Sequence, residues 1–185
     1  MDILQTIRNR RSIRQFKDKK ISDDILHKVL EAARWAPSAV NRQPWNFIVI
    51  KKESIKKKLS GKLFSAFISR APIVIAICAK IKKSKWAVID CSLAAQNIML
   101  EAHSLGLGTC FVGAFNEQKV KDILRIPKGI KVIGLITLGY PTEKKRKGIR
   151  LELDSIVSFN TYQNQKGNFF DKGLTSFVKK KISSK

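Results

Sequence analysis

The sequence lacks the features of a membrane-spanning or exported protein. No apolar run approaches the roughly 18 uninterrupted residues that are typical of a membrane span. The segment from Met1 to Lys20 has no apolar centre of the kind found in signal peptides. We therefore expect a cytoplasmic protein without a membrane span.

Residues that bind metals or act as nucleophiles are also scarce. His27 and His103 are the only histidines, so metal ligation is poorly supported. The only cysteines are Cys78, Cys91 and Cys110, and no two of them have the C-x-x-C spacing of a redox pair or a zinc site. We expect the thiols to be buried and the histidines to lie on helix surfaces. The sequence thus predicts no metal site and no catalytic side chain.

Acidic residues are few. The chain has 14 Asp and Glu but 37 Lys and Arg, which gives a formal net charge of +23. Such a charge makes acidic partners, including nucleic acid, worth considering. The basic residues are spread along the chain rather than gathered with aromatic side chains that could stack on bases. We favour a solvated surface, with contact to nucleic acid or membrane as the alternatives. A positive field would also attract a phosphorylated substrate, including a reduced nicotinamide nucleotide.

The size and the apolar content are those of one globular domain. The chain has 185 residues, of which 44% are hydrophobic, and it shows no internal repeat. We expect a single cofactor-binding domain over residues 1–160, followed by a basic C-terminal tail over residues 161–185. The tail is polar, charged and unsuited to a packed core.

Hydrophobic periodicity predicts a mixture of helices and strands. The strand at 71–79 is apolar throughout, which is typical of a strand covered on both faces. The longest helix carries Asp90, Gln96 and Asn97 on an otherwise apolar body, and these side chains need partners if they are buried. We expect helices over 2–9, 22–35, 53–59, 86–105 and 116–124, and strands over 46–50, 71–79, 131–138 and 153–160.

The loop over residues 36–47 has the composition of a binding surface. Pro37 and Pro44 fix their own backbones and keep the preceding helix from continuing. Between and beside them, Ser38, Asn41 and Gln43 offer hydrogen-bond donors and acceptors, as a flat heteroaromatic ring with mixed edges requires.

Two further stretches are candidates for ligand contact. Arg10, Arg11, Ser12 and Arg14 place three guanidinium groups and a hydroxyl within five residues, which suits either phosphate binding or a solvated helix end. The segment 106–115 contains three glycines, which permit close approach of a ligand or simply a turn at Gly113. Its spacing is not that of the dinucleotide-binding G-x-G-x-x-G motif, so phosphate binding there is not expected.

Together these stretches, in this order, resemble the FMN-dependent nitroreductase family, of which the chain looks like a short member. The matching segments are residues 10–14, 36–45, Asp90 with 94–97, and 106–110, so that the resemblance covers most of residues 2–160. It implies an α+β fold, the nitroreductase-like flavoprotein fold, with a central, mostly antiparallel sheet flanked by helices. It also implies a homodimer with FMN at the subunit interface and NADH or NADPH as the reductant.

The resemblance implies a role for particular residues in binding FMN. Gly113 offers a backbone N–H to the flavin, and such a donor helps to stabilise the reduced ring. The loop residues line the ring and come from the same subunit or from its partner. The implied cofactor-binding residues are Arg10, Arg11, Ser12 and Arg14 around the phosphate, Pro37, Ser38, Ala39, Asn41 and Gln43 around the ring, and Val112 and Gly113 beside it.

The chain also departs from the family pattern at two places. A basic pair before a proline normally adds a phosphate contact, and here Lys144 and Arg146 match that pair, while Gly148 occupies the proline position. Either Lys147 or Arg150 is an alternative for this contact. Larger members use an amide and a lysine upstream of the central strand, where this chain has Phe64 and Phe67.

The function implied by the resemblance is that of an FMN-dependent NAD(P)H oxidoreductase. It would reduce nitroaromatics, quinones or a similar small electron acceptor by a two-step, ping-pong hydride transfer. Because the cofactor carries the chemistry, the lack of a nucleophile or general base does not argue against this function. The alternatives are specialised flavin chemistry, such as reductive dehalogenation or flavin fragmentation, and a basic nucleic-acid-binding protein with a non-catalytic flavin.

Overall fold

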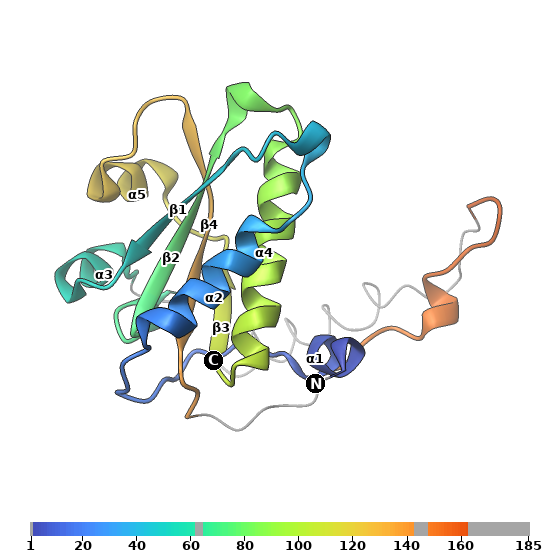
Figure 1. Ribbon diagram of the computed structural model, residues 1–185, viewed down its shortest axis with the longest axis horizontal. Coiled ribbons are helices and arrows are strands. Elements are labelled where there is room, and N and C mark those ends of the chain that lie inside the picture. The colour runs from blue at the N-terminus through green and yellow to red at the C-terminus, as the bar shows by residue number, and fades with distance from the viewer. Residues whose placement is uncertain (1, 62–64, 143–147, 163–185) are drawn as a thin grey trace, which may run out of the picture. The chain divides into compact units, whose positions relative to one another are not determined.

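The computed structural model describes residues 2–61, 65–142 and 148–162, and the chain divides into two compact units, residues 1–146 and 147–185. The first unit contains all of the helices and strands that are labelled in Figure 1. The predicted extent of the cofactor-binding domain, residues 1–160, stays a prediction. Among the described residues, no helix combines the length and the apolar character needed to cross a membrane.

The first unit is built on one antiparallel sheet. Its strands are β1 (Trp45–Ile50), β2 (Ile73–Lys80), β3 (Gly108–Val112) and β4 (Ile130–Gly139). They lie in the order β1-β2-β4-β3, and all three pairings are antiparallel. β2 is central and is buried along its whole length except at Lys80, so the prediction from its unbroken apolar run is confirmed.

Helices cover both faces of this sheet, as Figure 1 shows. On one face, α2 (Asp23–Arg34) and α4 (Ala87–Ser104) pack on alternate side chains of β2, including Ile75 and Ile77. On the other face, α3 (Glu53–Leu59) and α5 (Glu117–Leu124) pack on the intervening side chains, including Val74. This period of two is that of a strand, and it explains why every position of β2 before Lys80 is apolar.

The helices begin where their capping residues predict. Asp2 accepts a hydrogen bond from the Leu4 N–H at the start of α1 (Ile3–Asn9). Ser22 and Asn116 do the same for α2 and α5. A side-chain oxygen at this position satisfies one of the N–H groups that a helix leaves without a partner.

Residues 12–17 run along the sheet as a short extension of it. The Ile13 N–H donates to the Thr109 carbonyl oxygen at 2.8 Å, and the Lys17 N–H donates to the Tyr140 carbonyl oxygen at 2.8 Å. Isolated bridges join Ser12 to Thr109 and Phe16 to Pro141. The end of α1 is thereby held beside β3 and β4.

The structure differs from the expected elements at two places. Residues 108–112 form β3, although the glycine-rich segment was not expected to contain a strand. The strand expected over 153–160 is wrong, because Leu153–Ser155 is a 3-10 turn and no strand occurs in the described residues 148–162. There the Ser155 hydroxyl donates to the Glu152 carbonyl oxygen at 2.7 Å, a local bond of the kind that competes with strand pairing. In the stretch 62–70, the described part holds only the 3-10 helix Ala66–Ile68.

Candidate functional site

The loop over residues 36–47 has an unusual backbone. Val40, Asn41 and Gln43 have φ values of 51°, 52° and 46°, in the left-handed region. This conformation costs roughly 1–2 kcal/mol for a residue other than glycine and is least common for a β-branched side chain such as that of Val40. Strain of this kind persists only where the surroundings impose it, and it is concentrated at functional sites.

Contacts from distant parts of the chain hold the loop in this conformation. Asp90, in the first turn of α4, is only 3% exposed, and its Oδ1 accepts a hydrogen bond from the Ala39 N–H at 3.2 Å. Within the loop, the Ser38 Oγ accepts from the Gln43 N–H at 3.0 Å. The Arg42 guanidinium donates to a carbonyl oxygen of the 3-10 helix Ile81–Lys83 at 2.9 Å. The loop is therefore fastened to the start of α4.

Asp90 is a candidate functional residue that is not among the cofactor-binding positions expected from the sequence. Its second oxygen, Oδ2, is buried and has no hydrogen-bond partner in the described part of the chain. A buried acceptor without a partner costs free energy, so Asp90 is an unusual residue at this position of the fold. The sequence feature that could have indicated a role for Asp90 was the presence of a carboxylate on an otherwise apolar helix.

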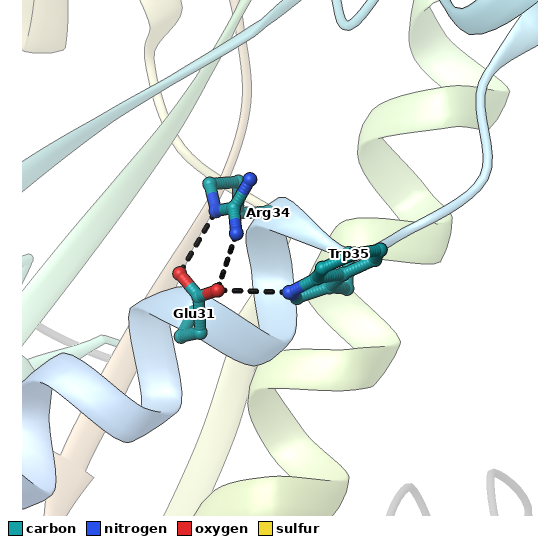
Figure 2. Close-up of polar contacts among 3 residues, drawn as sticks. All are labelled: Glu31, Arg34 and Trp35. Atoms are coloured by element: carbon teal, nitrogen blue, oxygen red, sulfur yellow. Dashed lines mark hydrogen bonds and ion pairs between the residues drawn. The ribbon is translucent and has the colours of Figure 1, made fainter.

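A cluster of three side chains fixes the end of α2, immediately before the loop (Figure 2). The Arg34 guanidinium pairs with the Glu31 carboxylate, and the Trp35 Nε1–H donates to Glu31 Oε1 at 2.8 Å. These hydrogen bonds, first that of Arg34 and then that of Trp35, lower the pKa of Glu31 to about 2. The cluster thus stays charged at physiological pH and orients Trp35, which is 72% exposed.

The arginine-rich segment borders a small cavity at the other end of α4. Arg10, the C-cap of α1, and Arg11 meet His103 of the last turn of α4 in this cavity, whose volume is about 40 Å³. The remaining lining residues are Ile13, Gly106, Leu107, Gly108, Thr109 and Pro141. By the same measure one water needs about 10–15 Å³, so a group of several atoms, such as a phosphate, can be accommodated.

The side chains of the arginine-rich segment also make contacts outside this cavity. The Arg11 Nη1 donates to the carbonyl oxygens of Arg8 and Arg10 at 2.6 and 2.7 Å, and so closes the end of α1. The Arg14 guanidinium lies 5.7 Å from the centre of the Phe67 ring, a cation–π distance. Ser12 is exposed on the sheet extension.

The other predicted residues occupy different parts of the fold. Pro37, Asn41 and Gln43 are exposed on the loop, while Ser38 and Ala39 are half-buried. Val112 is the buried last residue of β3, and Gly113 is the exposed residue after it. Lys144, Arg146, Lys147 and Phe64 lie outside the described residues.

The two halves of the expected site lie at opposite ends of α4 in one chain. Asp90, which holds the loop, is in the first turn, whereas His103, beside Arg10 and Arg11, is in the last. The helical rise of about 1.5 Å per residue separates Asp90 and His103 by roughly 20 Å along the axis. Figure 1 shows the same arrangement, with the loop that follows α2 at one end of α4 and α1 at the other.

Gly108 permits the close approach that brings the arginine-rich segment to the sheet. A Cβ atom at this position would lie 2.7 Å from the Cβ of Ile13, a side chain that is 4% exposed and cannot swing away. We predict that Gly108→Ala lowers the free energy of unfolding by about 1–3 kcal/mol, the usual cost of overpacking. Urea denaturation followed by circular dichroism measures this change.

Gly134→Ala is the matched control for that substitution. A Cβ at Gly134 would lie 2.3 Å from the Cζ of Phe111, but this atom is the far end of a side chain that is 39% exposed and can shift toward solvent. We expect a loss of stability clearly smaller than that of Gly108→Ala. Equal losses in the two variants would contradict the role assigned to the contact between Gly108 and Ile13.

The cysteines and histidines complete the inventory of reactive groups. Cys78, Cys91 and Cys110 are all buried, as predicted. Burial raises the pKa of Cys78 to about 11 and that of Cys91 to about 12, so both thiols are neutral and poor nucleophiles at pH 7. His27 is exposed on α2 as expected, but His103 is not on the surface, because the end of α4 packs its ring against the small cavity.

The antiparallel sheet lies between two helical layers, which makes this an α+β fold. The strained loop and the arginine-lined cavity lie at the two ends of α4, the longest helix. Together these features are those of the nitroreductase type. The profile of the family described as "Nitroreductase family" matches residues 7–72 and 60–140. The chain belongs to this family, and the prediction of family and fold is confirmed.

Relatives and solved structures agree with this assignment. A protein of Methanothermobacter thermautotrophicus, named as a candidate NADH dehydrogenase or NAD(P)H nitroreductase, is 40% identical over 152 residues, which are 77% of this chain and 79% of the relative. The "FMN reductase [NAD(P)H]" of Bacillus subtilis is 25% identical over 100% of this chain and 86% of its own length. An "FMN-dependent Nitroreductase" structure from Clostridium difficile superimposes with a TM-score of 0.79 and 31% identity, over 86% of this chain and 99% of that one.

Proposed function

We propose that this protein is an FMN-dependent NAD(P)H oxidoreductase. It reduces nitroaromatics, quinones or a similar small acceptor in two steps, with NAD(P)H leaving before the acceptor enters. The observation that carries the proposal is the cavity of phosphate size that Arg10 and Arg11 line at the end of α4. The relatives named as FMN reductase and FMN-dependent nitroreductase support the same cofactor.

The phosphate side of the proposed site fits the chemistry of FMN. Arg10 borders a cavity that Gly108 and Thr109, at the start of β3, also line. Guanidinium groups form charge-assisted hydrogen bonds with phosphate oxygens, often two at a time. The positive field of a chain with a net charge of +23 further favours an anion here.

The ring side fits a planar heterocycle. The loop exposes the side-chain amides of Asn41 and Gln43, and its backbone is held by Asp90 before any ligand arrives. A preorganised loop loses little entropy on binding, so its hydrogen bonds contribute more to affinity. We assign Pro37, Ser38, Ala39, Asn41 and Gln43 to the ring, and Val112 and the Gly113 N–H to its edge.

Bound FMN would supply the hydride chemistry, and the side chains of this protein would bind and orient it. The Gly113 N–H, exposed directly after β3, is the donor proposed to meet negative charge on the reduced ring. Lys144 and Arg146 remain the proposed second pair of phosphate ligands, with Lys147 and Arg150 as alternatives.

We further propose that the protein is a homodimer in which the loop of one chain faces the arginine-lined cavity of the other. In a single chain the loop and the cavity lie at opposite ends of α4, as described above. If two copies of α4 cross in antiparallel orientation about a two-fold axis, each loop comes close to the partner's cavity. The predicted FMN contacts from both halves are then made by two chains.

The surface of α4 supports such an interface. Its 18 residues contain no Lys or Arg, although these make up 37 of the 185 residues of the chain. Its exposed side includes Val88, Ile89 and Leu93, and α1 next to it exposes Ile3, Leu4 and Ile7. Exposed apolar patches of this kind mark interaction surfaces. In a two-fold contact the same surface of both chains meets, so Lys or Arg side chains on α4 would lie opposite like charges. The lack of Lys and Arg on α4 therefore favours such a contact in this strongly basic protein.

The test of the proposed function is spectroscopic. We expect the purified full-length protein to be yellow, to be bleached by NADH or NADPH without oxygen, and to regain its colour when a nitroaromatic or quinone is added. Titrating both nucleotides against a panel of acceptors, including halogenated phenols for the dehalogenation alternative, identifies the preferred pair. A colourless protein that cannot be loaded with FMN would overturn the proposal. Steeply salt-dependent binding of DNA by such a protein would favour the nucleic-acid alternative instead.

A further inference from the structure

A second cavity, of about 210 Å³, lies on the other face of the sheet, where α5 ends. It is separate from the proposed flavin site, because none of its lining residues is among those assigned to FMN. They come from β1, β2, the turn after α5 and the start of β4, and they are Asn46, Ile48, Cys78, Lys80, Leu124, Arg125, Ile126, Pro127 and Ile130.

The interior of this cavity is apolar. Ile48 and Ile130 belong to two strands of the sheet, and Leu124 and Ile126 belong to the end of α5 and the turn after it. An engineered apolar cavity of about 150 Å³ is known to bind benzene, so a cavity of about 210 Å³ can hold a phenyl ring and one small substituent.

The rim of the cavity determines the charge of that substituent. Lys80 and Arg125 line it, and no acidic residue does. Within the described ranges, neither of these two side chains forms an ion pair. A carboxylate complements such a pair, because a guanidinium can bind both of its oxygens at once.

The backbone of Arg125 is a second observation that points to a site. Arg125 ends α5 in the left-handed conformation, with φ 55° and ψ 43°. Glycine is the usual residue at this position because it has no Cβ, and an arginine here costs free energy. Strained residues of this kind are concentrated at functional sites, and in this chain the loop over residues 36–47, called the flavin loop below, has the same feature.

We propose that this cavity binds a small aromatic carboxylate of the size of benzoate. The ring lies among Ile48, Ile126 and Ile130, and the carboxylate is bound by Arg125 and Lys80. The site adjoins the base of the flavin loop, because the Lys80 N–H donates to the Pro44 carbonyl oxygen at 2.9 Å. It shares no residue with the proposed flavin site, so neither proposal depends on the other.

The test follows the isoleucine methyl groups of the flavin-loaded, full-length protein by NMR during a titration with sodium benzoate. We expect saturable shifts of the methyl signals of Ile48, Ile126 and Ile130. Benzamide, which has no charge, and benzylammonium, which has the opposite charge, are the ligand controls and should bind at least about tenfold more weakly. Equal binding of either control, or no shift of these signals up to about 10 mM benzoate, would overturn the proposal.

Arg125→Gly separates binding from folding. Glycine relieves the backbone strain, so we expect a Tm no lower than that of the unchanged protein, together with a loss of benzoate affinity of about tenfold. Lys128→Gln removes a charge three residues away, outside the cavity lining, and should leave the affinity within about twofold. Lys80→Gln provides an independent test on a different element and should weaken binding in the same direction. Unchanged benzoate binding in both Arg125→Gly and Lys80→Gln would rule out the assigned carboxylate contacts.

Discussion

Replacing Arg10 and Arg14 together with alanine should lower the affinity for FMN by about a hundredfold or more, because both guanidinium groups are proposed to form charge-assisted hydrogen bonds with the phosphate, Arg10 from the small cavity and Arg14 after turning away from the Phe67 ring. Arg10 lines the small cavity, and Arg14 lies on the sheet extension that leads away from it. Riboflavin has the same ring and ribityl chain without the phosphate, so its affinity should change by less than about threefold. Fluorescence quenching of each flavin on binding measures both constants.

The matched control removes two other basic side chains from the same part of the chain. Arg8 is exposed on α1, and Lys17 takes part in the sheet extension only through its backbone N–H. We expect Arg8→Ala with Lys17→Ala to leave the affinity for FMN within about threefold, the effect of a general loss of positive charge. If the Arg10 and Arg14 variant loses FMN and riboflavin equally, these two residues do not bind phosphate.

Replacing Ile89 and Leu93 with lysine should convert the proposed dimer into a monomer. Burial of a large apolar side chain stabilises an interface by about 1.5–3 kcal/mol. In a two-fold interface each of these residues is buried in both chains, so its contribution is made twice. The substitutions remove that contribution and place like charges opposite each other in a chain whose net charge is already +23. Light scattering after size-exclusion chromatography should report the single-chain mass of 20.9 kDa instead of twice that value.

The same variant tests whether the flavin site is shared between two chains. If the loop of one chain serves the cavity of the other, the monomer should lose bound FMN although neither half of the site has been altered. Gln118→Lys, which adds a charge to the exposed side of α5 on the opposite layer, should keep both the dimer and the flavin. A monomeric, unaltered protein that retains FMN would contradict the shared site.

The local structure of this protein was largely predictable from its sequence. Ser22 and Asn116 cap helices as expected, and the apolar run in β2 was correctly read as a buried central strand. Such features depend on residues within three or four positions of one another, or on burial of a whole element. The strand predicted over 153–160 was wrong. Its apolar pattern is weak, and local hydrogen bonds such as that of Ser155 are formed there instead of strand pairing.

The candidate site was predictable in its parts, because the arginine-rich segment and the proline-bounded loop are continuous stretches of chain. The residues that connect those parts were not predictable in the same way. Asp90 supports the loop through a hydrogen bond to Ala39, 51 positions away, and nothing near Asp90 in the sequence indicates this partner. His103 was expected on a helix surface and instead borders the same cavity as Arg10.

The sequence by itself determined the family, the helix starts, the buried central strand and the two segments proposed to bind the cofactor. Each of these rests on residue types at fixed short spacings. Only the tertiary structure decided that the loop is strained and held by α4, that Arg10 and Arg11 line a cavity, and that loop and cavity lie at opposite ends of one helix. These features arise from packing between residues distant in the chain, so the proposed subunit sharing and the second cavity, with Arg125 at its rim, could be inferred only from the folded molecule.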